Sequence, residues 1–305
     1  MEIEELLIDV KEQQLAVVAV NTHVNNMPLI FIHGVLASVN FWKSVIPNEI
    51  LDSHPWYSVS LPGHYPSTLP QGFSPTDIDE DWMADVYEAA IEKLIGDKDY
   101  ILVGHSTGGF AALNLGARQP EKLKGIVSIA GFYNGDWGGI EGMLVKIASW
   151  GRWAKPLFVA NLALGRSLRG LQETLSSLLA HDRVAYKNSP RTQKMLSDIQ
   201  ENIQAQTLSH LFPLFNRIST FDIRHKLSNI QLPVWLFVGT HDPVIHAQQS
   251  LVLADAIPNA ETIIFEDTGH MPFMEKAAEF NSQFLLAISH INQDPTEPSE
   301  VLHAV

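Results

Sequence analysis

The chain has 305 residues, of which 46% are hydrophobic, so it can bury a full core as one large α/β domain or as a core with an inserted subdomain. Its formal charge of −14, from 34 acidic and 20 basic residues, disfavours phosphate backbones and anionic membranes, and we expect no nucleic-acid partner. The chain contains no cysteine, which excludes disulfides, thiolate metal sites and a cysteine nucleophile.

The beginning of the chain, Met1–Glu5, is acidic where a signal peptide would be basic. No apolar run approaches the roughly 20 residues that a membrane-spanning helix needs. We therefore expect a cytoplasmic protein without stable membrane insertion.

Strand-like and helix-like stretches alternate along the first part of the chain, which is typical of a mostly parallel sheet with helices on both faces. Ile3–Val10 and Gln14–Val20 are predicted to open the sheet as an antiparallel pair. Ile78–Ile95 is predicted to be a helix because its apolar residues recur at intervals of three and four. Short buried strands are expected at Leu29–Ile32, Tyr57–Leu61, Tyr100–Val103 and Gly125–Ala130.

The alternation stops over residues 134–221, a helix-rich segment, and the sheet pattern returns at Pro233–Val238. We interpret the segment as a helical cap, or lid, inserted between two strands and lying over the carboxyl ends of the sheet. The core then comprises residues 1–133 and 222–292, and the tail at 293–305 is predicted to be disordered. The closing elements are expected at Ala247–Ala256 (helix), Thr262–Phe265 (strand) and Ala277–Ile291 (helix).

The run Gly104-His105-Ser106-Thr107-Gly108 follows an apolar strand-like stretch and opens the helix-like stretch Phe110–Arg118. A strand, a sharp turn and a helix with serine at the apex form a nucleophile elbow, in which small glycines let the backbone segments crowd together. A glycine-flanked serine alone is often only a helix N-cap. Partners that follow in the required chain order make Ser106 the candidate nucleophile.

A serine hydroxyl needs a general base within hydrogen-bond reach. His270, in the turn-rich segment after the last predicted strand, is the candidate base. Asp242 follows the preceding strand and would hold the imidazole in the required tautomer. Each of these positions could also be an ordinary turn, but the order Ser, Asp, His is that of a catalytic triad in α/β-hydrolases.

An oxyanion hole requires backbone N–H donors aimed at the developing charge. Thr107, directly after Ser106, supplies one donor, and Val35 supplies the other. Gly34 permits the bend that turns the Val35 amide inward. We expect Gly34 and His105 to lie beside the bound substrate.

The spacing of the histidines matches no metal-ligand motif, so no metal is expected. The glycine-rich run around Ser106 lacks the lysine of a P-loop and does not match the dinucleotide-binding pattern. The sequence therefore predicts no cofactor.

At these motifs the chain resembles the α/β-hydrolase superfamily, in its capped branch of esterases, lipases and C–C hydrolases, over about residues 3–290. Members that use an aspartate nucleophile, such as epoxide hydrolases and haloalkane dehalogenases, are disfavoured by Ser106. Ser60 and Tyr65 depart from the aspartate and glycine of many relatives. The resemblance is carried by His33–Ser38, Gly63-His64, Gly104–Gly109, Gly239–Asp242 and Gly269-His270.

The resemblance implies a serine hydrolase that cleaves a carboxylic ester or thioester, a small-molecule substrate with an apolar part, through an acyl-enzyme. Trp137, Trp150 and Phe212 are candidates for lining the acyl pocket, with packing inside the cap as the alternative. C–C bond hydrolysis, acyl transfer or perhydrolysis with the same triad stay open, as does a slow-turnover ligand receptor. The sequence does not indicate whether the protein is a monomer or an oligomer.

Overall fold

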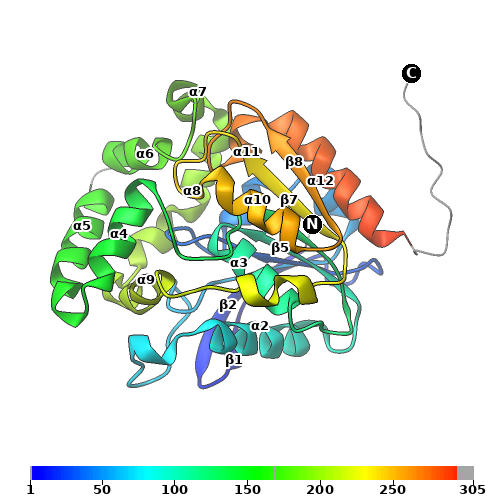
Figure 1. The fold of residues 1–305 in the computed structure, drawn as a ribbon, viewed down its shortest axis with the longest axis horizontal. Coiled ribbons are helices and arrows are strands. Elements are labelled where there is room, and N and C mark those ends of the chain that lie inside the picture. Colours follow the sequence, from blue (N-terminus) through cyan, green and yellow to red (C-terminus); the bar gives the residue numbers. More distant parts are fainter. Residues whose placement is uncertain (1, 168, 294–305) are drawn as a thin grey trace.

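The computed structural model describes residues 2–167 and 169–293, so the predicted disordered tail lies, apart from Gln293, outside the described residues. An eight-stranded sheet runs through the centre of the molecule (Figure 1). Its strands are β1 (Ile3–Val10), β2 (Gln13–Val20), β3 (Leu29–Ile32), β4 (Trp56–Val59), β5 (Tyr100–His105), β6 (Leu123–Ile129), β7 (Val234–Gly239) and β8 (Ala260–Phe265).

The strand order is β1-β2-β4-β3-β5-β6-β7-β8. β2 pairs antiparallel with both β1 and β4, and the pairs from β4 to β8 are parallel. The predicted fold class, a mostly parallel α/β sheet, is therefore confirmed. Its parallel strands place their carboxyl ends along one edge, where open α/β sheets bind ligands.

Helices join and cover the strands. α2 (Glu80–Ile95) begins after its N-cap Asp79, whose Oδ1 accepts a hydrogen bond from the Trp82 N–H at 2.7 Å. Ile78 belongs to the preceding turn, so the helix starts two residues later than predicted. The other helices outside the stretch between β6 and β7 are α1 (Asn48–Ser53), α3 (Thr107–Gly116), α10 (Ala247–Ala256), α11 (Pro272–Glu275) and α12 (Ala277–Asn292).

Strand β6 shows that α3 and α12 cover opposite faces of the sheet. A Cβ added at Gly125 would lie 2.7 Å from the Ile291 side chain of α12. A Cβ added at Gly116 of α3 would lie 2.5 Å from Ile126, the next residue along β6. Because successive side chains of a strand point to opposite faces, the two helices sandwich the sheet.

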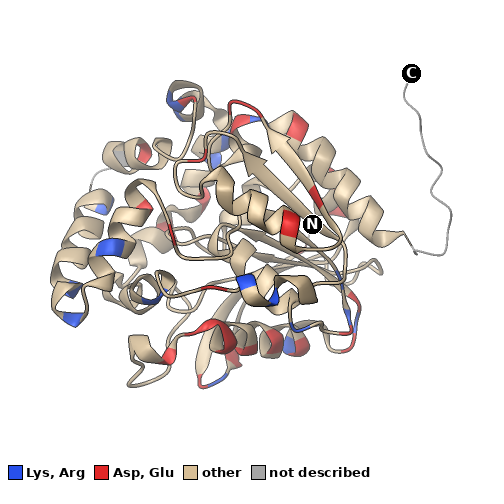
Figure 2. Ribbon diagram, viewed as in Figure 1, with Lys and Arg blue, Asp and Glu red and all other residues tan. Residues whose placement is uncertain are grey.

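Acidic residues recur along α2 (Figure 2). Arg118, just after α3, pairs with Asp81 at 3.1 Å, Asp85 at 2.6 Å and Glu88 at 3.3 Å. These ion pairs join α2 to α3, the helix that follows Ser106.

The α-helices between β6 and β7 lie together at one side of the molecule (Figure 1). The segment leaves and rejoins the core at a single point, where Asn134 bridges Asp222 and the Gly135 N–H donates to the Phe221 carbonyl at 3.1 Å. The assignment of residues 134–221 to a separate cap stays a prediction. Its helices are α4 (Gly139–Ser149), α5 (Lys155–Ser167), α6 (Arg169–Ser177), α7 (Arg183–Asn188), α8 (Pro190–Ala205) and α9 (Phe212–Ile218).

Of the helices within residues 2–167 and 169–293, none has both the length and the apolar character required to cross a bilayer.

Candidate active site

Ser106 lies at the turn between β5 and α3 with a φ of 55° and a ψ of −115°, a conformation that non-glycine residues rarely adopt. The turn is held by two backbone hydrogen bonds: the Ser106 N–H donates to the Ile129 carbonyl at 2.9 Å, and the Phe110 N–H donates to the Ser106 carbonyl at 3.0 Å. Such strain persists only where the surroundings enforce it, and it concentrates at functional sites.

The glycines around Ser106 are required by close backbone contacts. A Cβ at Gly104 would lie 2.1 Å from the Gly108 carbonyl oxygen, and a Cβ at Gly108 would lie 2.0 Å from the Ile32 carbonyl oxygen. These backbone atoms cannot move aside as a flexible side chain could. The sequence motif is thus explained by the crossing of α3 over β3 and β5.

Replacing Gly108 by alanine is expected to destabilise the fold by about 3 kcal/mol or more, because the new methyl group would overlap the backbone of β3. Chemical denaturation would measure the loss. The matched control is Gly170→Ala, since Gly170 lies in α6, has no positive φ and has open space where the new methyl group would be. A loss in Gly108→Ala no larger than in the control would contradict this account of the elbow.

Asp242 and His270 are brought together from loops that follow β7 and β8. Their Oδ2 and Nδ1 atoms lie 2.7 Å apart, and both side chains are buried. Oδ1 of Asp242 accepts hydrogen bonds from the N–H groups of Val244 and Ile245, at 2.8 and 2.9 Å. The carboxylate is therefore fixed by its own loop and orients the imidazole.

Two opposing effects set the pKa of His270. Burial disfavours the imidazolium and is the largest single influence, lowering the pKa, but the charges of Asp242, Glu141 and Glu275 and the hydrogen bond to Asp242 together outweigh it, so the pKa is raised above its ordinary value. The charged form of His270, which arises when it takes the proton of Ser106, is therefore favoured by its surroundings. Among the described residues no hydrogen bond joins Ser106 to His270, and bonds of this kind often form only with substrate bound.

Ser106 and His270 open into one cavity of about 220 Å³. Gly34, Val35 and His105 line the same cavity on its core side. The opposite wall comes from the helices between β6 and β7 and is mainly apolar, with Ile140, Leu144, Leu162, Leu196, Ile199 and Ile203 among its residues. The predicted nucleophile and base thus face a largely apolar pocket.

The two predicted oxyanion donors lie beside Ser106. Thr107 is the first residue of α3, so its N–H has no partner within the helix. A Cβ at Gly34 would lie 3.0 Å from the Cβ of Ser106, which shows how closely the loop carrying Val35 approaches the serine. No described residue accepts a hydrogen bond from the Val35 N–H. Both amides are therefore available to a ligand.

Two buried histidines hold the loops of the site. The His33 Nδ1 lies 2.8 Å from the Gly34 carbonyl, and its Nε2 accepts from the Leu61 N–H at 3.2 Å, while burial lowers its pKa to about 4. His105 bonds through Nε2 to the His270 carbonyl at 3.0 Å, and burial lowers its pKa as well. Each ring therefore positions backbone as a neutral group.

The three aromatic residues predicted to line the acyl pocket lie outside the cavity wall. Trp137 packs edge-on against Phe132, and Phe212 packs against Phe158, in both cases filling space between elements. Trp150 is 47% exposed and stacks on Trp153 at the surface. These three side chains pack against other aromatic rings, and branched aliphatic side chains form much of the cavity wall.

Sequence reasoning missed Glu141, which lies in the first turn of α4 and lines the cavity. The residue is 9% exposed, and its Oε2 has no hydrogen-bond partner among the described residues. Burial raises its pKa, and it interacts electrostatically with both His270 and Asp242. No motif surrounds Glu141, so only the fold could reveal a carboxyl group at this position.

The chain resembles known proteins in sequence and in fold. The model of the alpha/beta hydrolase fold family matches residues 27–277. The chain is similar to the pimeloyl-[acyl-carrier protein] methyl ester esterase of Nitrosomonas europaea, with 25% identity over 88% of this chain and 99% of that one. It is also similar to the protein of that name from Legionella pneumophila, with 23% identity over 83% of this chain and 91% of the relative.

The structure is similar to that of a thermophilic esterase from Thermogutta terrifontis, with a TM-score of 0.70 and 16% identity over 95% of this chain and all of that one. At this identity the similarity establishes a shared fold. Since the family match spans most of the chain and includes the turn at Ser106, the chain belongs to the alpha/beta hydrolase fold family.

Proposed function

We propose that the protein is a serine carboxylesterase that cleaves an ester or thioester with an apolar acyl or alcohol part. The observation that carries this proposal is the convergence of the strained Ser106 and the hydrogen-bonded Asp242–His270 pair on one largely apolar cavity. The names of the curated relatives, which describe methyl ester hydrolysis, support an ester as the scissile group.

In the proposed mechanism, His270 removes the proton from Ser106 as the serine oxygen attacks the ester carbonyl. The Val35 and Thr107 amides stabilise the tetrahedral oxyanion. His270 then donates its proton to the leaving alkoxide or thiolate, and an acyl-enzyme forms. Water, deprotonated by the same imidazole, releases the acid and restores Ser106.

Hydrolysis of a nitrophenyl ester series from acetate to long acyl chains tests this proposal. We expect a measurable rate with an optimum at an intermediate chain length, because the cavity is apolar but of limited volume. No hydrolysis of any member would contradict the proposal. Tight ligand binding without turnover would then favour a receptor.

Placing tryptophan at Leu162 is expected to move the chain-length optimum toward shorter esters, because this residue of α5 lines the cavity wall. The matched control is Leu164→Trp, since Leu164 is on the same helix but 64% exposed. The kcat/KM for the longest good substrate should fall about tenfold or more in the first variant and stay unchanged in the second. If kcat/KM depended on acyl-chain length in the same way for both variants, the proposed acyl pocket would be contradicted.

Glu141→Gln is expected to shift the acidic limb of the kcat/KM profile to lower pH. Glu141 raises the pKa of His270, so removing its charge lowers the pH at which the imidazole becomes protonated and inactive. A control variant, Glu279→Gln, changes a charge on the exposed side of α12. If the acidic limb of the kcat/KM profile lay at the same pH in Glu141→Gln as in the wild type, the Glu141 carboxyl group would not influence the pKa of His270.

A further inference from the structure

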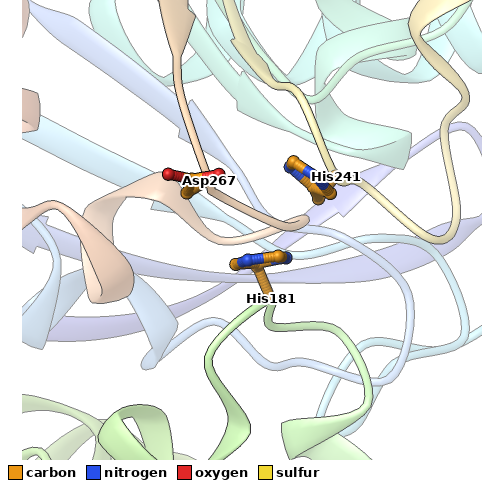
Figure 3. Close-up of side chains that lie close together, drawn as sticks. All are labelled: His181, His241 and Asp267. Atoms are coloured by element: carbon orange, nitrogen blue, oxygen red, sulfur yellow. The ribbon is translucent and has the colours of Figure 1, made fainter.

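Three exposed side chains from separate parts of the sequence meet beside the active-site loops: His181, His241 and Asp267 (Figure 3). One ring nitrogen from each histidine and one carboxylate oxygen of Asp267 all lie within 4.8 Å of one another. The two imidazole rings have centroids 4.2 Å apart. The close-up shows the three side chains around one common space (Figure 3).

His241 and Asp267 are held in place by Thr240. The Thr240 Oγ1 lies 3.0 Å from the His241 Nδ1, accepts from the Asp267 N–H at 3.1 Å and approaches the Phe265 carbonyl at 3.4 Å. When the hydroxyl donates to that carbonyl, its oxygen accepts from Nδ1–H, and Nε2 keeps the lone pair that a metal requires. A hydrogen bond from the outer side of a metal-binding histidine is the usual support for such a ligand.

His181 comes from the segment between α6 and α7 and is held against the same loops by its backbone. Its N–H donates to the Glu275 carboxylate at 2.7 Å, and the other oxygen of Glu275 accepts from the Gly269 N–H at 2.9 Å. The His270 N–H also donates to the Leu179 carbonyl at 2.7 Å. The segment that carries His181 therefore lies directly on the loop that carries His270.

We propose that His181, His241 and Asp267 form a binding site for one divalent transition-metal ion of the Zn²⁺ class. Two imidazoles and a carboxylate are ligands that such ions accept, and water would complete a tetrahedral shell. The ligands come from three loops, so small side-chain rotations can bring them to coordination distance. The ion would tie the helical segment between β6 and β7 to the two loops that carry Asp242 and His270.

The expectation that the chain holds no metal rests on the spacing of the histidines along the sequence, whereas the fold brings these three residues together from distant positions. The proposed metal site is independent of the proposed function, because none of the three residues belongs to the proposed catalytic machinery. Its consequence is structural: an occupied site resists separation of the segment 179–182 from the loop at residues 267–270.

Equilibrium dialysis of the metal-stripped full chain against Zn²⁺ tests the site, with His181→Gln, His241→Gln and Asp267→Asn as variants. Asparagine is chosen at position 267 because that residue has a φ of 50°, which asparagine tolerates. The matched control is His225→Gln, an exposed histidine outside the cluster. Substituting Co²⁺ for Zn²⁺ reports the coordination geometry through its visible absorption.

We expect one equivalent of Zn²⁺ in the wild type and in His225→Gln, and its loss in each of the three ligand variants. The Tm of the wild type should rise by about 2 °C for each tenfold increase in the Zn²⁺ concentration above its dissociation constant, and that of the ligand variants should not. Equal Zn²⁺ uptake by the wild type and the ligand variants would overturn the proposal, because the ion would then bind other histidines. Absence of binding to the wild type would overturn it as well.

Discussion

Replacing Ser106 by alanine is expected to lower kcat/KM for nitrophenyl ester hydrolysis by roughly 10⁶-fold, the loss typical of removing a catalytic serine. The reason is that, within residues 2–167 and 169–293, no other hydroxyl is placed both at the strained turn and in the cavity. Ser176 of α6 and Tyr186 of α7 also line the cavity, but neither lies at that turn. Steady-state kinetics on purified protein measures the effect.

The matched control is Ser167→Ala, which removes an exposed hydroxyl from α5. Both variants should retain the wild-type Tm within a few degrees, since Ser106→Ala leaves the backbone contacts of the elbow intact. If Ser106→Ala hydrolysed the esters at the wild-type rate, the acyl-enzyme route would be wrong.

Asp242→Asn is expected to lower kcat by about 10⁴-fold while preserving the fold. The asparagine carbonyl can still accept from the Val244 and Ile245 N–H groups. Its amide N–H₂ would then face the His270 Nδ1 and favour the tautomer that carries its proton on Nε2, which cannot accept the proton of Ser106. Removing the carboxylate also lowers the pKa of His270, so the acidic limb of the pH profile should move to lower pH.

Asp255→Asn, on the exposed side of α10, supplies the control for removing a negative charge. It should leave kcat and the pH profile unchanged. A kcat for Asp242→Asn within tenfold of the wild type would show that another group orients His270, and Glu141 would be the next residue to replace.

The strands were predictable from sequence because buried parallel strands consist of short, continuous apolar runs. β8 shows where this signal weakens. As the edge strand it begins with half-exposed or exposed residues, Ala260 and Glu261, so the apolar run predicted a start only at Thr262. The apolar pattern also misplaces helix boundaries, because a capping residue sets them. The start of α2 is set by Asp79 and not by the apolar Ile78.

The proposed triad was predictable because each member follows a strand of the sheet, and the carboxyl ends of parallel strands meet at one edge. The residues that form the cavity wall could not be predicted, since the direction of a side chain on a packed helix depends on its neighbours. Trp150 illustrates this: its size suggested a pocket role, but it stacks on Trp153 at the surface. Glu141 and His181 have no local motif, and only the folded chain places them near the site.

Labelling with a fluorophosphonate, which reacts with activated serines, tests the central claim that Ser106 is the nucleophile. We predict one equivalent of label per chain, located by peptide mass spectrometry on Ser106, with loss of esterase activity in proportion to labelling. An unlabelled Ser106 in an active esterase, or a label on another residue that tracks the loss of activity, would contradict the account.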